Sequence, residues 1–308
     1  MFRFVSSAQD FDYLPIGPGE LIHHSFFSLS YSEEHEQAYW VAYEFTYQEA
    51  FSAFERSDDF RFDPSVSTGS ADLEDYIGSG YDRGHLAPAG DMGFSETAMT
   101  ESFYFSNMSP QDPSFNRGIW KKLESQVRSW ALTDSLLYVV TGPVLEDSLP
   151  TIGPNQVAVP RAYFKIVLSP EGESFKGIGF LLPNAKNSQA IEAFIVSIDS
   201  IETLTGLDFF PALEDSVEFA VEQGSDAGAW QFGLVNAAKA GAKSTAEAKQ
   251  CMGVTQKKKR CKKSAGPGSD YCHLHEYQAP TQCKAITNSG TRCSRLTVDE
   301  SGKCWQHK

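Results

Sequence analysis

The stretch from Tyr81 to Met92, YDRGHLAPAGDM, places a histidine beside an arginine and an aspartate in a segment typical of neither a regular helix nor a regular strand. His85 carries the side chain whose ordinary pKa lets it take a proton from water near neutral pH. Arg83 lies two residues earlier, and Gly84 between them permits backbone conformations that other residues avoid. Alone, this group also fits a salt-bridged polar turn.

A second polar set follows in YFSNMSP and NRGIWKKLE: Asn107, Asn116, Glu124 and Arg128. If one helix runs through the second segment, Asn116 and Glu124 are about 12 Å apart along its axis. Glu124 would then reach the water around an ion at Asn116 more easily than the ion itself. Each residue also has a simpler explanation, because Asn116 could cap the helix and Glu124 could pair with Arg128 on its surface.

Hydrolysis of a phosphodiester requires the parts that these two segments offer together. A base must deprotonate water, and a divalent cation and arginines must stabilise the negative charge that develops on the phosphoryl oxygens. The leaving 3'-oxygen needs a proton or a metal. One histidine, one metal ligand and two or three arginines would suffice, so the combination favours this chemistry over four unrelated surface features.

The pattern of apolar residues predicts the elements that position these side chains. Short alternating runs between residues 13 and 47 indicate strands, and the Ser-, Gly- and Asp-rich segment 65–80 indicates a loop. A helix is expected over Ser114 to Trp130, after Pro113. Its apolar face is formed by Trp120, Leu123, Val127 and Trp130.

Three apolar runs after this helix, LLYVVTGPVL, VAVPRAYFKIVL and GIGFLLPN, predict buried strands of a mixed sheet. A further helix is expected around residues 187–201. The fold class is therefore α+β, with a central mixed or antiparallel sheet flanked by helices.

Composition separates the chain into an acidic body and a basic tail. A hydrophobic fraction of 41% with 13% aromatic residues is typical of a globular protein. Residues 251–308 hold 11 Lys and Arg against 4 Asp and Glu, whereas residues 1–250 hold 15 against 36. No apolar run approaches the roughly 18 residues of a membrane-spanning helix, and the first 20 residues lack the pattern of a signal peptide. We expect no membrane association, and the basic tail suggests contact with nucleic acid or another polyanion.

All six cysteines lie in the tail, in two copies of the spacing C-x9-C-x10-C-x2-H with a period of 32 residues. Three thiolates and an imidazole form the ligand set of a closed zinc site. Modules of about 25 residues are too small to bury a sufficient core, so a bound metal would supply the free energy of folding. Three disulfides in a secreted protein are the alternative, but three cysteines per copy cannot pair within a copy and the repeated histidine would be unexplained. The predicted zinc ligands are Cys251, Cys261, Cys272 and His275 in the first copy, and Cys283, Cys293, Cys304 and His307 in the second.

The motifs of the body resemble, in order, those of the DNA/RNA non-specific endonuclease family, which includes endonuclease G and belongs to the ββα-metal superfamily. The resemblance rests on GSGYDRGHLAPAGDM, FYFSNMSPQDPSFNRGIWKKLE, YVVTGPVL, VAVPRAYFKIVL and GFLLPN, and it covers roughly residues 10–215. It implies the ββα-metal nuclease fold and a metal-dependent endonuclease that cleaves both DNA and RNA to 5'-phosphate ends. The tail, which is outside this family's common core, resembles small Cys3His modules of uncharacterised function.

Carried over to this chain, the resemblance implies that His85 is the general base and that Asn116 is the one protein ligand to Mg2+ or Mn2+. Glu124 would hold the water shell of the ion, Arg83 would contact substrate phosphate, and Arg128 would lie close to the scissile group. Asn107 would orient His85. An arginine that stabilises the transition state is also expected, for which Arg56 is the better match and Arg61 the alternative.

These inferences divide the chain into an endonuclease domain (1–225), a linker (226–250) and two zinc modules (251–282 and 283–308). A nucleic-acid-binding zinc protein with a weak or inactive nuclease scaffold is the alternative function. A third is a secreted effector whose disulfide-bonded tail docks to a partner. The tail is expected to bind nucleic acid or a protein, and homodimerisation is left open. Family resemblance favours a secreted or periplasmic location if a leader was removed, and a cytoplasmic one otherwise.

Overall fold

The computed structural model describes residues 12–172, 174–225 and 227–234, and beyond these residues 252, 260, 281–282 and 296–297. The chain forms two compact units, Met1–Ala237 and Ala238–Lys308. Every predicted residue of the candidate catalytic site lies in the first unit.

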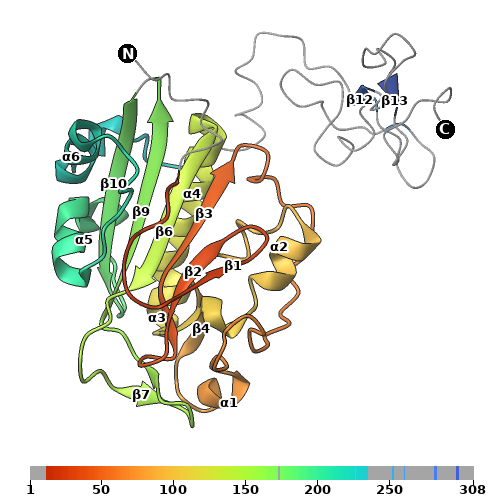
Figure 1. The fold of residues 1–308 in the computed structure, drawn as a ribbon, viewed down its shortest axis with the longest axis vertical. Coiled ribbons are helices and arrows are strands. Elements are labelled where there is room, and N and C mark those ends of the chain that lie inside the picture. The colour runs from red at the N-terminus through yellow and green to blue at the C-terminus, as the bar shows by residue number, and fades with distance from the viewer. Residues whose placement is uncertain are drawn as a thin grey trace. The chain divides into compact units, whose positions relative to one another are not determined.

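The centre of the first unit is a seven-stranded sheet with the order β1-β2-β3-β6-β9-β10-β11 (Figure 1). Its strands are β1 (Glu20–His23), β2 (Ser28–Ser32), β3 (Gln37–Thr46), β6 (Leu136–Pro143), β9 (Ala162–Glu171), β10 (Ser174–Pro183) and β11 (Ile195–Val196). All neighbouring pairs are antiparallel, so the expectation of a mixed sheet is wrong and its antiparallel alternative is confirmed. Most neighbouring pairs are formed by strands that follow one another directly in the chain. Short connections reverse the direction of the chain, so such strands pair in antiparallel orientation.

Both faces of this sheet are covered, because apolar side chains on the central strands point alternately to either side. One face packs against α4 (Lys121–Asp134), and the other against α5 (Ile198–Thr205) and α6 (Asp215–Gln223) (Figure 1). The strand residues on the α4 face include Val41, Tyr43, Val139, Val167, Ile178 and Phe180. Those on the opposite face include Trp40, Ala42, Tyr138, Val140, Ile166 and Leu168.

The expected helix over Ser114 to Trp130 exists but is not one regular α-helix. It begins as α3 (Pro113–Phe115), passes through the π-helical segment η2 (Asn116–Trp120) with a break at Gly118, and continues as α4. The predicted apolar face is correct, since Trp120, Leu123, Val127 and Trp130 are at most 1% exposed. The break has no counterpart in the apolar spacing, which is why the sequence indicates a straight helix.

Two other boundaries differ from the prediction. The loop 65–80 contains a short helix, α1 (Leu73–Tyr76), whose capping box is formed by Asp72 and Asp75. The helix expected around residues 187–201 is divided into the 3-10 turn η3 (Ile191–Phe194), strand β11 and the start of α5. In both regions, local capping and strand pairing outweigh the weak periodicity.

The candidate site lies in the long insertion between β3 and β6. After α1, this insertion contains β4 (Asp82–His85), α2 (Glu96–Glu101), the 3-10 turn η1 (Phe105–Asn107) and β5 (Met108–Gln111), and it ends in α3, η2 and α4. Strands β4 and β5 form an antiparallel pair of their own, and a second small pair joins β7 (Thr151–Ile152) to β8 (Val157–Ala158). The segment YDRGHLAPAGDM is therefore partly a strand.

The core of the first unit extends past residue 225, the boundary predicted from composition. Trp230 follows the 3-10 turn η4 (Ala227–Ala229), is 3% exposed, and packs on Trp130 with ring centroids 4.6 Å apart. Part of the predicted linker thus belongs to the body. An aromatic residue within an Ala- and Gly-rich stretch is the signal for this.

In the second unit, β12 (Thr281–Gln282) pairs with β13 (Leu296–Thr297) in antiparallel register. The two residues of β12, at the end of the predicted first zinc module, thus pair with the second module. The eight predicted zinc ligands lie outside the described residues: Cys251, Cys261, Cys272, His275, Cys283, Cys293, Cys304 and His307.

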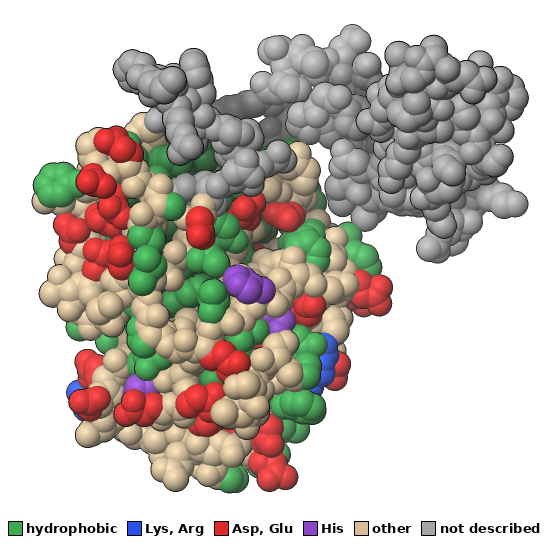
Figure 2. Space-filling view, in the orientation of Figure 1, with side chains coloured by type: hydrophobic (Ala, Val, Ile, Leu, Met, Phe, Trp, Pro, Cys, Tyr) green, Lys and Arg blue, Asp and Glu red, His purple; other side chains and the backbone are tan. Residues whose placement is uncertain are grey.

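The acidic character of the body is visible on its surface. Figure 2 shows one face, on which Asp and Glu side chains are numerous and Lys and Arg are few. Such a face repels a polyanion, so any nucleic acid would approach elsewhere. None of the helices in the described part of the chain is long and apolar enough to span a membrane.

Candidate active site

His85 ends β4, is almost fully buried, and packs against two aromatic rings. It pairs with Met108 across the β4–β5 ladder and is 7% exposed. Its imidazole meets the ring of Phe103 edge to face at 4.9 Å and the ring of Phe60 at 5.8 Å. Within the described residues, Nε2 has no hydrogen-bond partner. A buried polar atom without a partner is unusual in a protein and is often found at a functional site.

The surroundings of His85 keep its imidazole neutral. Burial, followed by the positive charges of Arg56 and Arg83, lowers the pKa of His85 to about 3. Both effects disfavour the imidazolium, the first by removing water and the second by repulsion. At neutral pH the imidazole is therefore unprotonated, although a pKa this low makes it a weak base in the free chain.

The two arginines are held near His85 by the same aromatic rings that enclose it. The guanidinium of Arg83 lies 4.0 Å from the centre of the Phe60 ring, and that of Arg56 lies 4.8 Å from the centre of Phe103. Stacking on an aromatic face holds a cation without neutralising it. Arg56 also pairs with Asp58 at 2.6 Å, in an exposed position that solvent screens.

Arg61, the alternative upstream arginine, is engaged elsewhere. Its guanidinium pairs with Asp59 at 2.5 Å, donates to the carbonyl of Thr100, and lies over the ring of Tyr104. Unlike Arg56, it is not among the charges that shift the pKa of His85.

Asn107 is fully buried and acts on the backbone just beyond His85. Its Oδ1 accepts from the amide of Ala87 at 2.8 Å, and its Nδ2 donates to the carbonyls of Ala87 and Ser102 at 2.9 and 2.8 Å. These bonds anchor the chain where it leaves β4. Any influence of Asn107 on the imidazole thus passes through the main chain.

Asn116 begins η2 and is tied to the start of β4. Its Nδ2 donates to Oδ2 of Asp82 at 3.0 Å, and Arg117 forms a two-pronged ion pair with the same carboxylate. Because Asp82 holds the nitrogen side of the amide, the oxygen Oδ1 is directed away from it. Amide oxygens are suitable ligands for Mg2+, so Asn116 fits the expected metal.

The helix start that carries Asn116 is fixed by its own sequence. Oδ1 of Asp112 accepts from the amides of Ser114 and Phe115, and Pro113 occupies the first turn. Both are favourable N-terminal features of a helix. The chain therefore enters the η2 segment in a fixed direction.

Glu124 and Arg128 lie on α4, on the side that faces the sheet. Burial raises the pKa of Glu124, while burial lowers the pKa of Lys165, which is fully buried on β9. Lys165 donates to Thr141 and lies over the ring of Trp120. The opposite charges of Glu124 and Lys165 act on each other, and this attraction opposes the desolvation of both.

Arg128 is held by a carboxylate that comes from the segment YDRGHLAPAGDM itself. Its guanidinium contacts Oδ1 of Asp91 at 2.6 Å, and Oδ2 of Asp91 accepts from the hydroxyl of Tyr43 at 2.6 Å. This chain of contacts joins β3, the loop after β4, and α4. Arg128 and Arg56 are both among the charges that act on Glu124.

A pocket of about 370 Å³ joins several of these residues at the surface. Its lining includes Arg56, Phe60, Arg83, Asn116 and Arg117. The cavity thus presents three guanidinium groups and the predicted metal ligand to one space. Asp58 and Asp82 also line it and pair with Arg56 and Arg117, so Arg83 is the guanidinium best placed to meet an anionic group. His85 is beneath this lining, against Phe60.

Two groups of important neighbours are not expected from the sequence. Asp91 lies within the segment that contains His85, but its partners Tyr43 and Arg128 come from elements distant in the chain. The enclosing rings of Phe60 and Phe103 are similarly remote. Two sequence features could have pointed to these contacts: the carboxylate Asp91 close to His85, and the charged residue Lys165 within the apolar run VAVPRAYFKIVL.

The model of the DNA/RNA non-specific endonuclease family matches residues 14–216. The chain therefore belongs to this family of nucleases, and the family resemblance of its motifs is confirmed.

Named relatives agree with this family. The chain is 37% identical over 203 residues to the mitochondrial nuclease EXOG of Danio rerio, covering 60% of this chain and 59% of that protein. It is 41% identical over 178 residues to nuclease C1 of Cunninghamella echinulata var. echinulata, covering 51% and 68%. With mitochondrial endonuclease G of Bos taurus the identity is 36% over 224 residues, covering 63% and 74%.

A solved structure supports the same fold. In the crystal structure of the EndoG/EndoGI complex, one chain superposes with a TM-score of 0.61 and 34% sequence identity. The match covers 65% of this chain and 89% of that one. The α+β fold of the body is thus the fold of a known nuclease.

Proposed function

We propose that the chain is a metal-dependent endonuclease that hydrolyses phosphodiester bonds in both DNA and RNA. The observation that carries this proposal is a buried, neutral His85 next to two arginines that stack on aromatic rings, beside a pocket lined by Asn116. Family membership supports the substrate class. The proposed products carry 5'-phosphate ends.

In the proposed mechanism, His85 is the general base. Its imidazole takes a proton from a water molecule, the oxygen of that water bonds to phosphorus, and the bond from phosphorus to the 3'-oxygen breaks. The 3'-oxygen leaves with a proton from solvent. The environment of Nε2 supports this role, because in the described part of the chain this nitrogen has no hydrogen-bond partner that would occupy its lone pair.

The arginines would bind and stabilise the phosphate. Arg83 lines the pocket and would contact the substrate phosphate, and Arg56 would stabilise the charge that develops on the phosphoryl oxygens. Arg128 would act near the scissile group from its fixed position on Asp91. Asn107 would act as a positioning residue, through the backbone that follows His85.

Asn116 would bind the catalytic Mg2+ or Mn2+ through Oδ1, and Glu124 would hold the hydration shell of the ion. The bound cation supplies positive charge that stabilises phosphoryl oxygens. Asp82 supports this role of Asn116, because it fixes the amide by accepting from Nδ2.

We also propose that the tail binds two zinc ions through its Cys3His sets, and that it holds nucleic acid. The repeated spacing and the positive charge of residues 251–308 support this. Elemental analysis of the purified full chain should give two zinc ions per chain. Three disulfides without zinc would contradict the proposal.

The proposed activity is tested by incubating the purified chain with plasmid DNA and with RNA in the presence of Mg2+. Both should be cleaved, and EDTA should stop the reaction. Asn116→Ala should lower the rate at least about a hundredfold, because ion binding contributes several kcal/mol to the transition state. Asn187→Ala, in a surface turn, is the matched control and should retain the rate. An unchanged rate in Asn116→Ala would overturn the metal assignment.

A further inference from the structure

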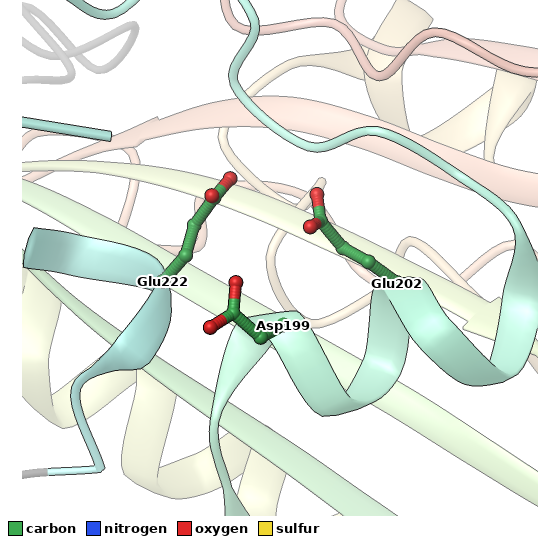
Figure 3. A group of neighbouring side chains, drawn as sticks. All are labelled: Asp199, Glu202 and Glu222. Carbon is green, nitrogen blue, oxygen red and sulfur yellow. The ribbon is translucent and has the colours of Figure 1, made fainter. Parts of the chain in front are cut away.

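Three carboxylates form a cluster on the side of the sheet opposite to α4. Asp199 and Glu202 project from α5, and Glu222 projects from the last turn of α6 (Figure 3). Each offers a carboxylate oxygen, and these oxygens lie within 4.8 Å of one another. The candidate active site uses none of the three.

Glu222 is the unusual member of this cluster. The residue is only 8% exposed, and in the described part of the chain its Oε1 has no hydrogen-bond partner. Figure 3 shows its side chain turned toward the carboxylates of Asp199 and Glu202. An enclosed carboxylate oxygen without a donor is costly unless a proton or a cation satisfies it.

The surrounding charge makes this position still less favourable for a bare carboxylate. Burial, followed by the surrounding charges, which are all negative, raises the pKa of Glu222 to about 8. They come from Glu202, Glu218, Asp199 and Asp208. Glu222 also lies near the C-terminus of α6, whose last turn contains no basic residue, so the helix dipole adds negative potential.

The backbone that presents these carboxylates is held close to the sheet. A Cβ atom at Gly177 on β10 would lie 2.6 Å from Val221, and one at Gly179 would lie 3.0 Å from Ile201. Both helices can therefore pack directly on the glycines. Glu202 is fixed further, because its Oε1 accepts from the amide of Phe209 at 2.8 Å.

We propose that Asp199, Glu202 and Glu222 bind a calcium ion that joins α5 to α6. A set made only of carboxylate oxygens suits a hard cation rather than zinc or copper. Mg2+ is usually held by one or two carboxylates and keeps most of its water, whereas Ca2+ accepts more carboxylates in looser geometry, so three carboxylates with oxygens within 4.8 Å of one another suit calcium. Water would complete the coordination. The site is structural and is separate from the Mg2+ site proposed at Asn116.

Calorimetric titration of calcium chloride into the full chain, in buffer cleared of metal on a chelating resin, tests this site. The wild type and Asn116→Ala should bind one calcium ion with similar affinity. Glu222→Gln and Asp199→Asn should weaken that binding at least about tenfold, because affinity depends on ligand charge. Glu34→Gln removes one charge from an exposed position and should bind as the wild type does.

Thermal unfolding supplies a second readout, namely the gain in melting temperature that calcium gives to the wild type and not to Glu222→Gln. Without calcium, Glu222→Gln should melt no lower than the wild type, because glutamine fills the same space without adding a charge among the neighbouring carboxylates. With calcium at ten times its dissociation constant, the wild type should gain roughly 3 °C and Glu222→Gln should gain little. No calcium binding to the wild type, or equal binding to Glu222→Gln, would overturn the proposal. Cleavage of DNA by Glu222→Gln with Mg2+ should be unchanged, which also shows that the variant is folded.

Discussion

The charge around His85 governs what its imidazole can do. In the free chain, burial and two nearby arginines lower its pKa to about 3. A phosphate bound beside Arg56 and Arg83 would offset their positive charge, so the pKa of His85 would rise when substrate is present. The imidazole would thus stay neutral until the substrate arrives and become a stronger base afterwards.

The same shift predicts how stability depends on pH. The pKa of His85 is lower in the folded chain than in the unfolded chain, so the unfolded state takes up a proton first as the pH falls. Stability from this group is complete above about pH 6.5 and falls by about 1.4 kcal/mol per pH unit from there toward pH 3. His85→Gln removes this contribution.

Urea unfolding at pH 7 and pH 5, followed by tryptophan fluorescence, measures this dependence. Between these two values the wild type should lose about 2 kcal/mol more than His85→Gln. Because only the change with pH is compared, an offset in the stability of the variant does not affect the result. Equal losses in both proteins would show that His85 is protonated in the folded chain as easily as in the unfolded chain.

Replacement of single arginines tests which one completes the site. Arg56→Ala should lower kcat/KM on plasmid DNA about a hundredfold, the usual effect of removing one group that stabilises developing charge. Arg61→Ala should change it only severalfold, because Arg61 is bonded to Asp59 and Thr100 away from His85. A larger loss in Arg61→Ala, with an unchanged melting temperature, would reverse the assignment.

The identities of the candidate site residues are more predictable than those of the residues that surround them. His85, Asn116, Glu124 and the arginines stand in short polar motifs whose order can be compared with a family. Tyr43 and Phe103 cannot be found in this way, because their contacts depend on how distant elements pack. Ordinary aromatic residues carry no local sign of such a role.

At the scale of the element, the β4–β5 pair positions both halves of the site. His85 ends β4, and Asp82 at the start of the same strand holds Asn116. From the sequence, Gly84 permits backbone conformations that other residues avoid, but its φ is not positive. The structural reason is space, since a Cβ at Gly84 would overlap the side chain of Gln111, which is fully buried.

Gly84→Ala should therefore force β4 away from β5. We expect a loss of about 1–3 kcal/mol in the free energy of unfolding, typical of overpacking, together with reduced cleavage because His85 moves. Gly224→Ala is the control, since a Cβ there comes no closer than 3.3 Å, to the carbonyl oxygen of Ala220, a tight contact without the overlap seen at Gly84. Unfolding in urea and initial cleavage rates measure both effects. A Gly84→Ala variant as stable and active as the control would show that the β4–β5 contact is not critical.

Element types can be predicted from the sequence better than element boundaries. The apolar faces of α4 and the central strands follow regular spacing, and burial of these positions is confirmed. The spacing of apolar residues predicts neither the break at Gly118 nor the division of segment 187–201. They depend on local backbone geometry and on pairing of β11 with β10.

At the scale of the whole molecule, charge separates the body from the tail. The body has 15 basic against 36 acidic residues, so unspecific attraction of nucleic acid must come from local groups such as the pocket arginines or from the tail. A sharp compositional change makes the tail easy to recognise. The end of the body is less predictable, because Trp230 contacts Trp130 across 100 residues of sequence.

Removal of residues 238–308 tests the role of the tail. The cut follows the compact unit that contains Trp230, so cleavage should persist. Affinity for duplex DNA should fall, and the slope of log affinity against log salt should decrease by about 0.9 for each phosphate that the tail neutralises in the full chain. Both are measured by fluorescence anisotropy with His85→Ala variants, to prevent cleavage. If affinity and slope were unchanged, the tail would not bind nucleic acid.

The most direct test of the central claim is the initial rate of plasmid cleavage, at saturating Mg2+, by His85→Ala. His23→Ala is the control, because that histidine is exposed and its ring nitrogen Nδ1 bonds to the hydroxyl of Ser28. If His85 is the general base, its loss should lower the rate by about 10²–10⁴-fold while His23→Ala cleaves normally. A His85→Ala variant that cleaves at the wild-type rate would contradict the proposed mechanism.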